Sequence, residues 1–133
     1  SVYKQLRGAG FHIPTVAHPT AWIETSAEIA DGCQVFPFAY IGTEVLIGFG
    51  CIINTGVIVS HNVELRPYVN LSPGATLAGG VIVGERALIG MRATVNLNVQ
   101  VGEDARIGNG ATVKADVPDG GVVPAGTIWP PRR

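Results

Sequence analysis

The amino-acid sequence is dominated by a period of six residues. From Ile23 to Pro118 the chain divides into sixteen consecutive hexads without an insertion, and every hexad begins with Ile, Val or Leu. The fifth residue of every hexad is Ala, Val or Cys. No α-helix repeats every six residues, and a half-buried β-strand alternates with a period of two. A generic β-sandwich does not explain one phase held over so many residues, so the pattern predicts a solenoid of stacked, similar units.

The spacing of the apolar positions predicts a triangular coil made of three hexads. Each hexad supplies one short strand and one turn, with its first residue pointing into the prism and its small fifth residue filling a corner. Neighbouring coils pair as parallel strands about 4.8 Å apart, so equivalent side chains stack in columns. Sixteen hexads amount to about five coils. The fold class that follows is all-β, a parallel β-helix with a short N-terminal helix before it.

Outside the repeat, the two ends of the chain have patterns of their own. Residues 1–22 predict a short helix over 2–7, which ends at the glycines that follow it, and then an extended lead-in that contains Pro14 and Pro19. Residues 23–118 are the hexapeptide-repeat region. Residues 119–133 predict one closing strand and a Pro-rich tail.

Composition excludes several classes of protein. Hydrophobic residues make up 47% of the 133 residues and charged residues only 14%, a balance that excludes intrinsic disorder. The formal net charge of -1 gives no electrostatic footprint for nucleic acid. The longest uncharged stretch, 45–63, contains Asn54, Ser60 and His61, so no membrane insertion is expected. Without a secretory signal pattern and with two cysteines, the sequence favours a cytoplasmic location.

The two cysteines provide a check on the predicted stacking. Cys33 and Cys51 both occupy fifth positions and are eighteen residues apart, so they are expected to lie one above the other inside the prism. Distance alone leaves a disulfide open, but two buried thiols in an apolar column are favoured. No His or carboxylate shares that column, so the pair gives little support for a metal site or a nucleophile.

His61 is the strongest candidate for chemistry. The chain has no phosphate-binding loop, zinc-binding HExxH or GxSxG motif. His12 and His18 lie in the lead-in, where a solvated or structural role is the simpler interpretation. His61 is the only histidine inside the coils, at the third position of VSHNVE, where its side chain points outward from a corner. An ordinary surface histidine is the alternative interpretation.

The hexads resemble those of bacterial hexapeptide-repeat sugar acyltransferases. The resemblance extends over RGAGF and HPTA in the lead-in, the run VSHNVELRPYVNLSPGATLAGGV and the DVPDG end. The most similar group is that of the sialic acid O-acetyltransferases, which includes nucleotide amino-sugar N-acetyltransferases of polysaccharide biosynthesis. This resemblance implies a left-handed β-helix, a homotrimer, and acetyl-CoA bound in a groove between two subunits. It also implies a nucleotide-linked sugar as acceptor, with no metal.

The resemblance further implies roles for individual residues. His61 is expected to be the general base that takes a proton from the acceptor, which a histidine can do because its imidazole is partly neutral near pH 7. Gly79, one coil later on the same corner, is expected to donate its N–H to the oxyanion. Asn70 is expected to contact the acetyl group, and Met91 and Asn109 to contact coenzyme A.

Two further sets of residues are candidates for contacts with other molecules. Exposed apolar side chains at turns fit a subunit interface: Phe36, Phe38, Phe49 and Met91. Basic side chains in the later coils are candidate partners of the coenzyme A phosphates, although at least half of them fit solvated corner charges: Arg86, Arg92, Arg106 and Lys114.

The sequence also departs from this family. Asn62 stands where an acidic residue often follows the base, and Asn70 stands where a second histidine is common. A Rossmann-like sugar-binding domain usually precedes the repeat, and residues 1–22 resemble its last element. An amino group and a hydroxyl both remain open as the acceptor. The non-enzymatic alternative is a structural or assembly solenoid. A γ-type carbonic anhydrase needs three histidines around zinc, and the coils contain only His61, so the sequence does not fit that enzyme.

Overall fold

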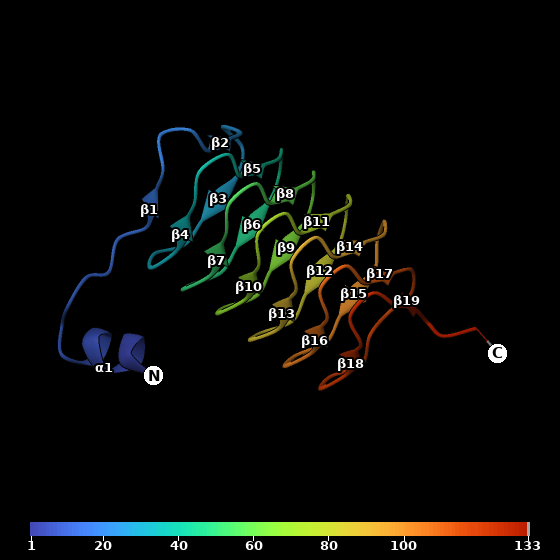
Figure 1. Ribbon diagram of the computed structural model, residues 1–133. Coiled ribbons are helices and arrows are strands. Elements are labelled where there is room, and N and C mark those ends of the chain that lie inside the picture. The colour runs from blue at the N-terminus through green and yellow to red at the C-terminus, as the bar shows by residue number, and fades with distance from the viewer. Residues whose placement is uncertain (133) are drawn as a thin grey trace.

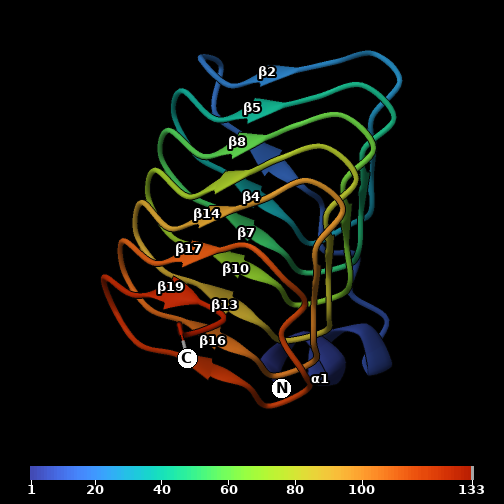
Figure 2. The same cartoon turned by 90° about the vertical axis from the view of Figure 1, so that its right-hand side faces the viewer.

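The solenoid predicted from the hexads is present. The structure, a computed structural model, describes residues 1–132, which form one short helix followed by a left-handed triangular β-helix (Figure 1). Figure 2 shows the coils stacked so that strands of the same face follow one another along the axis. The helix α1 (Val2–Gly8) is capped by the Ser1 hydroxyl, which accepts a hydrogen bond from the Lys4 N–H.

The strands form three parallel sheets, which we call faces A, B and C of the prism. Face A consists of β1 (Val16–Ala17), β4 (Gln34–Val35), β7 (Ile52–Ile53), β10 (Asn70–Leu71), β13 (Leu88–Ile89), β16 (Arg106–Ile107) and β18 (Val122–Val123). Face B consists of β2 (Trp22–Ile23), β5 (Tyr40–Ile41), β8 (Ile58–Val59), β11 (Thr76–Leu77), β14 (Thr94–Val95), β17 (Thr112–Val113) and β19 (Ile128–Trp129). Face C consists of β3 (Glu28–Ile29), β6 (Leu46–Ile47), β9 (Glu64–Leu65), β12 (Ile82–Val83) and β15 (Gln100–Val101).

The core consists of the first and fifth hexad positions. Successive strands of a face pair at a spacing of eighteen residues, as in Ile41↔Val59, so one aliphatic side chain stacks on the next. From Cys33 to Val117, every residue that the sequence places at a first or fifth position is buried. In the first coil Ile23, Ala27 and Ile29 are only partly covered, because no complete coil precedes them.

At most turns between faces, the residue at the fourth hexad position has a left-handed backbone. Glycine supplies it at several turns, and elsewhere a side-chain-bearing residue adopts it, as do Asn62 with φ 58° and Asn98 with φ 58°. Asparagine tolerates this region better than most residues. Glycine occurs at second hexad positions for a different reason. A Cβ at Gly48 would lie 2.7 Å from the Pro67 nitrogen, so glycine lets adjacent coils approach closely.

The C-terminal segment differs from the prediction of one closing strand. It contains two strands, β18 and β19, which continue faces A and B. Val117 pairs with Val101, sixteen residues earlier, because the segment between Val113 and Val117 is two residues shorter than a hexad. Val117 therefore takes a first position rather than the fifth one expected for it, and the six-residue spacing resumes at Val123 and Trp129. Together with β1, these strands lengthen the solenoid beyond the five coils expected.

The final coil carries prolines in place of the usual second-position residues. Within the solenoid, the second-position N–H of each coil donates to a carbonyl of the next coil, as Asn54 N–H does to Leu71 O at 3.1 Å. Pro118, Pro124 and Pro130 occupy this position after the last first-position residues, and proline has no N–H.

Helix α1 is held against the solenoid by an aromatic cluster. The rings of Tyr3 and Phe49 meet edge to face with centroids 5.5 Å apart, and Phe49 meets Tyr68 at 5.9 Å. The Arg7 guanidinium lies 4.2 Å from the centre of the Phe49 ring, and the Tyr3 hydroxyl donates to the Gly32 carbonyl at 3.0 Å. Phe49, which the sequence analysis assigned to a subunit interface, therefore packs against the chain's own helix.

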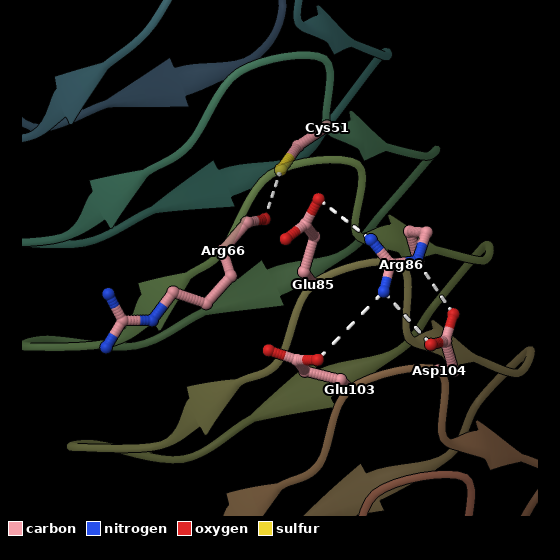
Figure 3. Close-up of polar contacts among 6 residues, drawn as sticks. All are labelled: Cys51, Arg66, Glu85, Arg86, Glu103 and Asp104. Atoms are coloured by element: carbon pink, nitrogen blue, oxygen red, sulfur yellow. Dashed lines mark hydrogen bonds and ion pairs between the residues drawn. The ribbon is translucent and has the colours of Figure 1, made fainter. Parts of the chain in front are cut away.

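The two cysteines are free thiols, buried inside the prism as favoured from the sequence. Cys33 Sγ lies 3.2 Å from the Gly48 carbonyl, and Cys51 Sγ lies 3.2 Å from the Arg66 carbonyl (Figure 3). A hydrogen bond with Cys33 and burial in the core raise the pKa of the Cys51 thiol.

No helix within residues 1–132 has the length and apolar character that a membrane span requires.

The register predicts that two adjacent residues differ sharply in how well they tolerate a large side chain. Ala93 is fully buried at a corner, and Thr94 is exposed on face B. We expect Ala93→Phe to lower the free energy of unfolding by about 1–3 kcal/mol or more, because a ring overpacks the corner. Thr94→Phe should change it far less. Chemical denaturation of both variants tests the register, and equal losses would contradict it.

Candidate functional site

His61 lies on the edge of the prism where face B meets face C. It follows β8, with its side chain exposed, and Asn62 makes the left-handed turn that leads toward β9. The outward position expected from the hexad phase is therefore confirmed. We call this edge, with His61, Asn62 and the residues aligned with them in other coils, the B/C edge.

Gly79 lies directly beneath the imidazole of His61, one coil further along the B/C edge. A Cβ placed on Gly79 would come within 2.5 Å of both Nε2 and Cε1 of His61, so only glycine allows the ring to lie there. Gly79 is buried, and its N–H donates no hydrogen bond to any residue in the described part of the chain. The ring nitrogen Nε2 and a free backbone donor thus adjoin each other.

Asn62 contacts the other ring nitrogen of His61. The Asn62 Oδ1 atom lies 3.0 Å from His61 Nδ1. A carbonyl oxygen can only accept, so this contact places a proton on Nδ1 and leaves the lone pair on Nε2. The departure from an acidic residue at position 62 therefore keeps a hydrogen bond that orients the ring, without adding a negative charge.

Met91 and Asn109 lie together on a different edge, where face A meets face B. The Asn109 Oδ1 atom accepts a hydrogen bond from the Met91 N–H at 2.9 Å, and the Met91 side chain is 48% exposed. They line an open groove along this A/B edge, with Thr55, Pro73, Gly74, Arg92 and Gly110. The groove runs parallel to the solenoid axis, since its residues come from successive coils.

Asn70 is an outward-facing, half-buried residue of face A, aligned with Ile52 and Leu88. Face A and the A/B edge therefore hold Asn70, Met91 and Asn109, whereas the B/C edge holds His61 and Gly79. The B/C edge is the one edge of the triangle that face A does not reach. Within one chain, the structure thus brings the expected site residues together in two groups on opposite sides of the prism.

Among the basic candidates, Arg86 is already paired. It makes two hydrogen bonds to Asp104, at 2.8 and 3.0 Å, and an ion pair with Glu85 at 2.9 Å (Figure 3). The hydrogen bonds from Arg86 lower the pKa of the Asp104 carboxyl. Arg86 therefore connects adjacent coils and is a poor phosphate ligand. The other three candidates form no ion pair with residues 1–132: Arg92, Arg106 and Lys114.

The described residues include no group of three or more His, Cys, Asp or Glu side chains arranged to hold a metal ion. The polar groups at His61 are its imidazole, the Asn62 amide and the N–H of Gly79.

Known proteins share this repeat and this fold. The family model for the bacterial transferase hexapeptide (six repeats) matches residues 80–115. A histidine-to-asparagine mutant of perosamine N-acetyltransferase from Caulobacter crescentus, solved in complex with CoA and GDP-perosamine, is 35% identical to the chain, with a TM-score of 0.91. The match covers 92% of this chain and 59% of that one.

Two other solved structures give the same result. The acetyltransferase domain of PglB from Neisseria gonorrhoeae, in complex with acetyl coenzyme A, is 33% identical over 92% of this chain and 60% of its own, with a TM-score of 0.91. WeeI from Acinetobacter baumannii is 26% identical over 91% of this chain and 59% of its own, with a TM-score of 0.88. This chain thus spans about three fifths of the length of these proteins. No curated protein matches it.

The contact between His61 and Gly79 predicts a specific effect of adding one methyl group. Gly79→Ala should displace the imidazole, because the new Cβ overlaps Nε2 and Cε1, while stability changes little since the exposed ring can rotate away. The imidazole resonances of His61 in an NMR spectrum should shift markedly. Gly8→Ala is the control, because a Cβ there meets no atom within 4 Å. Unchanged His61 resonances in the Gly79 variant would contradict the contact.

Proposed function

Since the chain is a hexapeptide-repeat protein that resembles sugar N-acetyltransferases in sequence and fold, we propose that it transfers an acetyl group from acetyl-CoA to a nucleotide-linked bacterial sugar. The acceptor is an amino group, with a hydroxyl as the second possibility. We place this reaction in polysaccharide biosynthesis and in the cytoplasm.

One observation supports this proposal most strongly. His61 is exposed, its Nδ1 lies 3.0 Å from Asn62 Oδ1, and its ring lies against Gly79, whose N–H donates to no acceptor in the described residues. A base and an oxyanion donor thus adjoin one point on the surface, which is what direct acyl transfer requires.

In the proposed reaction, the acceptor nitrogen attacks the carbonyl carbon of the acetyl thioester while His61 Nε2 removes its proton. The carbonyl oxygen becomes an oxyanion and accepts a hydrogen bond from the Gly79 N–H. When this intermediate collapses, the C–S bond breaks, and the departing thiolate takes the proton from the imidazolium. Asn62 holds the ring in the required orientation and tautomer throughout, because its carbonyl accepts from Nδ1.

We further propose that the active enzyme is a homotrimer in which each site is shared by two subunits. A closed ring packs one surface of each copy against a different surface of its neighbour. Face A of one copy, placed against the B/C edge of the next, unites Asn70 with His61 and Gly79. Coenzyme A would then lie along the groove of Met91 and Asn109, with Arg92 and Arg106 available to its phosphates.

Removal of the proposed base tests the assignment of His61. We expect His61→Ala to lower the rate of acetyl transfer by about 10²–10⁴, the usual contribution of a general base. Acetyl-CoA affinity by calorimetry and the melting temperature should stay nearly unchanged, since the side chain is exposed. Asn70→Ala should cost much less, because only a hydrogen bond is lost.

The assay is thiol release from acetyl-CoA with a panel of nucleotide-linked amino sugars. His12→Ala is the control, because His12 is exposed in the lead-in and has no proposed role. Full turnover by His61→Ala would show that His61 is a bystander. A wild-type protein with neither turnover nor acetyl-CoA binding would favour the non-catalytic solenoid.

Subunit mixing tests the shared site. Light scattering should show a trimer at micromolar concentration, and His61→Ala and Asn70→Trp should each be nearly inactive, the second because a bulky ring blocks face A. Random mixing of the two variants should restore about a quarter of the wild-type activity, since that share of interfaces unites two intact surfaces. A stable monomer, or mixtures that stay inactive, would refute the shared site.

A further inference from the structure

The early coils differ from the later coils in charge. Between Gly8 and Leu65 the sequence has no Lys or Arg, while it has five acidic residues: Glu24, Glu28, Asp31, Glu44 and Glu64. The basic residues of the solenoid begin at Arg66 and continue to Lys114. A phosphate group is therefore disfavoured beside the early coils, and a neutral or cationic ligand is favoured there.

Three side chains on face B form a polar aromatic cluster in these early coils. Glu24 Oε1 accepts hydrogen bonds from the Trp22 indole N–H at 3.2 Å and from the Tyr40 hydroxyl at 3.1 Å. Both rings remain accessible, with Trp22 65% and Tyr40 36% exposed. No residue in the range 1–132 donates a hydrogen bond to Oε2 of Glu24. The cluster is thus held in place by its own contacts and keeps one carboxylate oxygen free.

The cluster lies in line with His61. Strand pairing aligns Ile23 with Ile41 and Ile41 with Val59, so Glu24 stands two coils before Ser60, the residue next to His61. At the spacing of parallel strands this separation is roughly 10 Å along the axis. Gly79 lies one coil beyond His61 in the opposite direction. A molecule that approaches His61 from the early coils therefore passes the cluster and does not pass Gly79.

The chemistry of the cluster suits a sugar better than a nucleotide phosphate. An exposed aromatic face packs against the apolar C–H face of a sugar ring and attracts an ammonium group, most strongly when the ring is an indole. A carboxylate oxygen accepts strong hydrogen bonds from hydroxyl or ammonium donors. The hydrogen bond to Glu24 raises the pKa of the Tyr40 hydroxyl, so Tyr40 remains a donor to the carboxylate.

We propose that Trp22, Glu24 and Tyr40 form the subsite for the sugar of the acceptor, which is a hydroxylated amino sugar. This inference rests on the proposed acetyl transfer at His61. The ring of the sugar, or one linked to it, packs on Trp22, and a hydroxyl or ammonium group donates to the free oxygen of Glu24. The diphosphate of the acceptor is directed away from the acidic early coils.

Steady-state kinetics provide the first test. Glu24→Gln and Trp22→Ala should each raise the KM for the acceptor about tenfold or more, as expected when a hydrogen bond to a charged group or an aromatic contact is lost. The KM for acetyl-CoA should not change. Glu28→Gln and Phe11→Ala are the matched controls, an exposed carboxylate on β3 and an exposed aromatic in the lead-in, and should leave both KM values unchanged. An unchanged acceptor KM in both cluster variants would overturn the proposal.

Direct binding separates this inference from the proposed function. In a Trp129→Phe background, Trp22 is the remaining tryptophan and its fluorescence reports on the cluster. Titration with nucleotide-linked amino sugars should quench it, whereas GDP and UDP alone should not. If no sugar of the panel quenches, or if GDP alone quenches equally, the subsite is wrong even when acetyl transfer is observed.

Two further outcomes have clear meanings. Quenching by an amino sugar without any acetyl transfer would support the subsite and reject the proposed function. If Trp22→Ala dissociates the trimer in light scattering, Trp22 is a subunit contact and the inference fails.

Discussion

The stacking of one aliphatic side chain on its equivalent eighteen residues later is the interaction on which the rest of this structure depends. Each strand is only two residues long, too short to be stable by itself. Its stability comes from the buried columns of Ile, Val and Leu, in which each coil covers the one before. Because these columns fix the register, they also determine which residues lie above one another at the surface. His61 and Gly79 meet because the core repeats without a slip between them.

The sequence predicted the core and the placement of the coils well, and for a physical reason. Inward positions admit few residue types, so almost every hexad shows the same residue types at these positions. The two-residue shortening after Val113 was not recognised, because Val117 fits the repeat both as a fifth and as a first residue. Phe49 was assigned to a subunit interface, since nothing local indicates that Tyr3, far away in sequence, covers it.

The candidate site was predicted less completely. The outward position of His61 and its alignment with Gly79 follow from the hexad phase, and the structure confirms both. The contact of Asn62 with Nδ1 depends on a turn conformation and a rotamer, neither of which the repeat specifies. The Trp22, Glu24 and Tyr40 cluster was also missed, although Trp22 and Tyr40 occupy the same outward position in adjacent coils. The placement of Asn70 and His61 on opposite sides of the prism follows from their spacing. They are nine residues apart, which is half of an eighteen-residue coil.

The prolines of the last coil have a consequence for the behaviour of the protein in solution. A parallel β-solenoid ends in an open row of backbone groups, which could template the addition of another chain in the way that amyloid ends grow. Pro118, Pro124 and Pro130 stand where amide donors would otherwise project from each of the three faces. The prolines therefore reduce the number of amide donors at this end of the coils, while the N–H groups of Val122 and Ile128 donate to no acceptor within residues 1–132. At these three positions another chain could not add by the backbone pairing that holds the coils together, because proline has no N–H to donate.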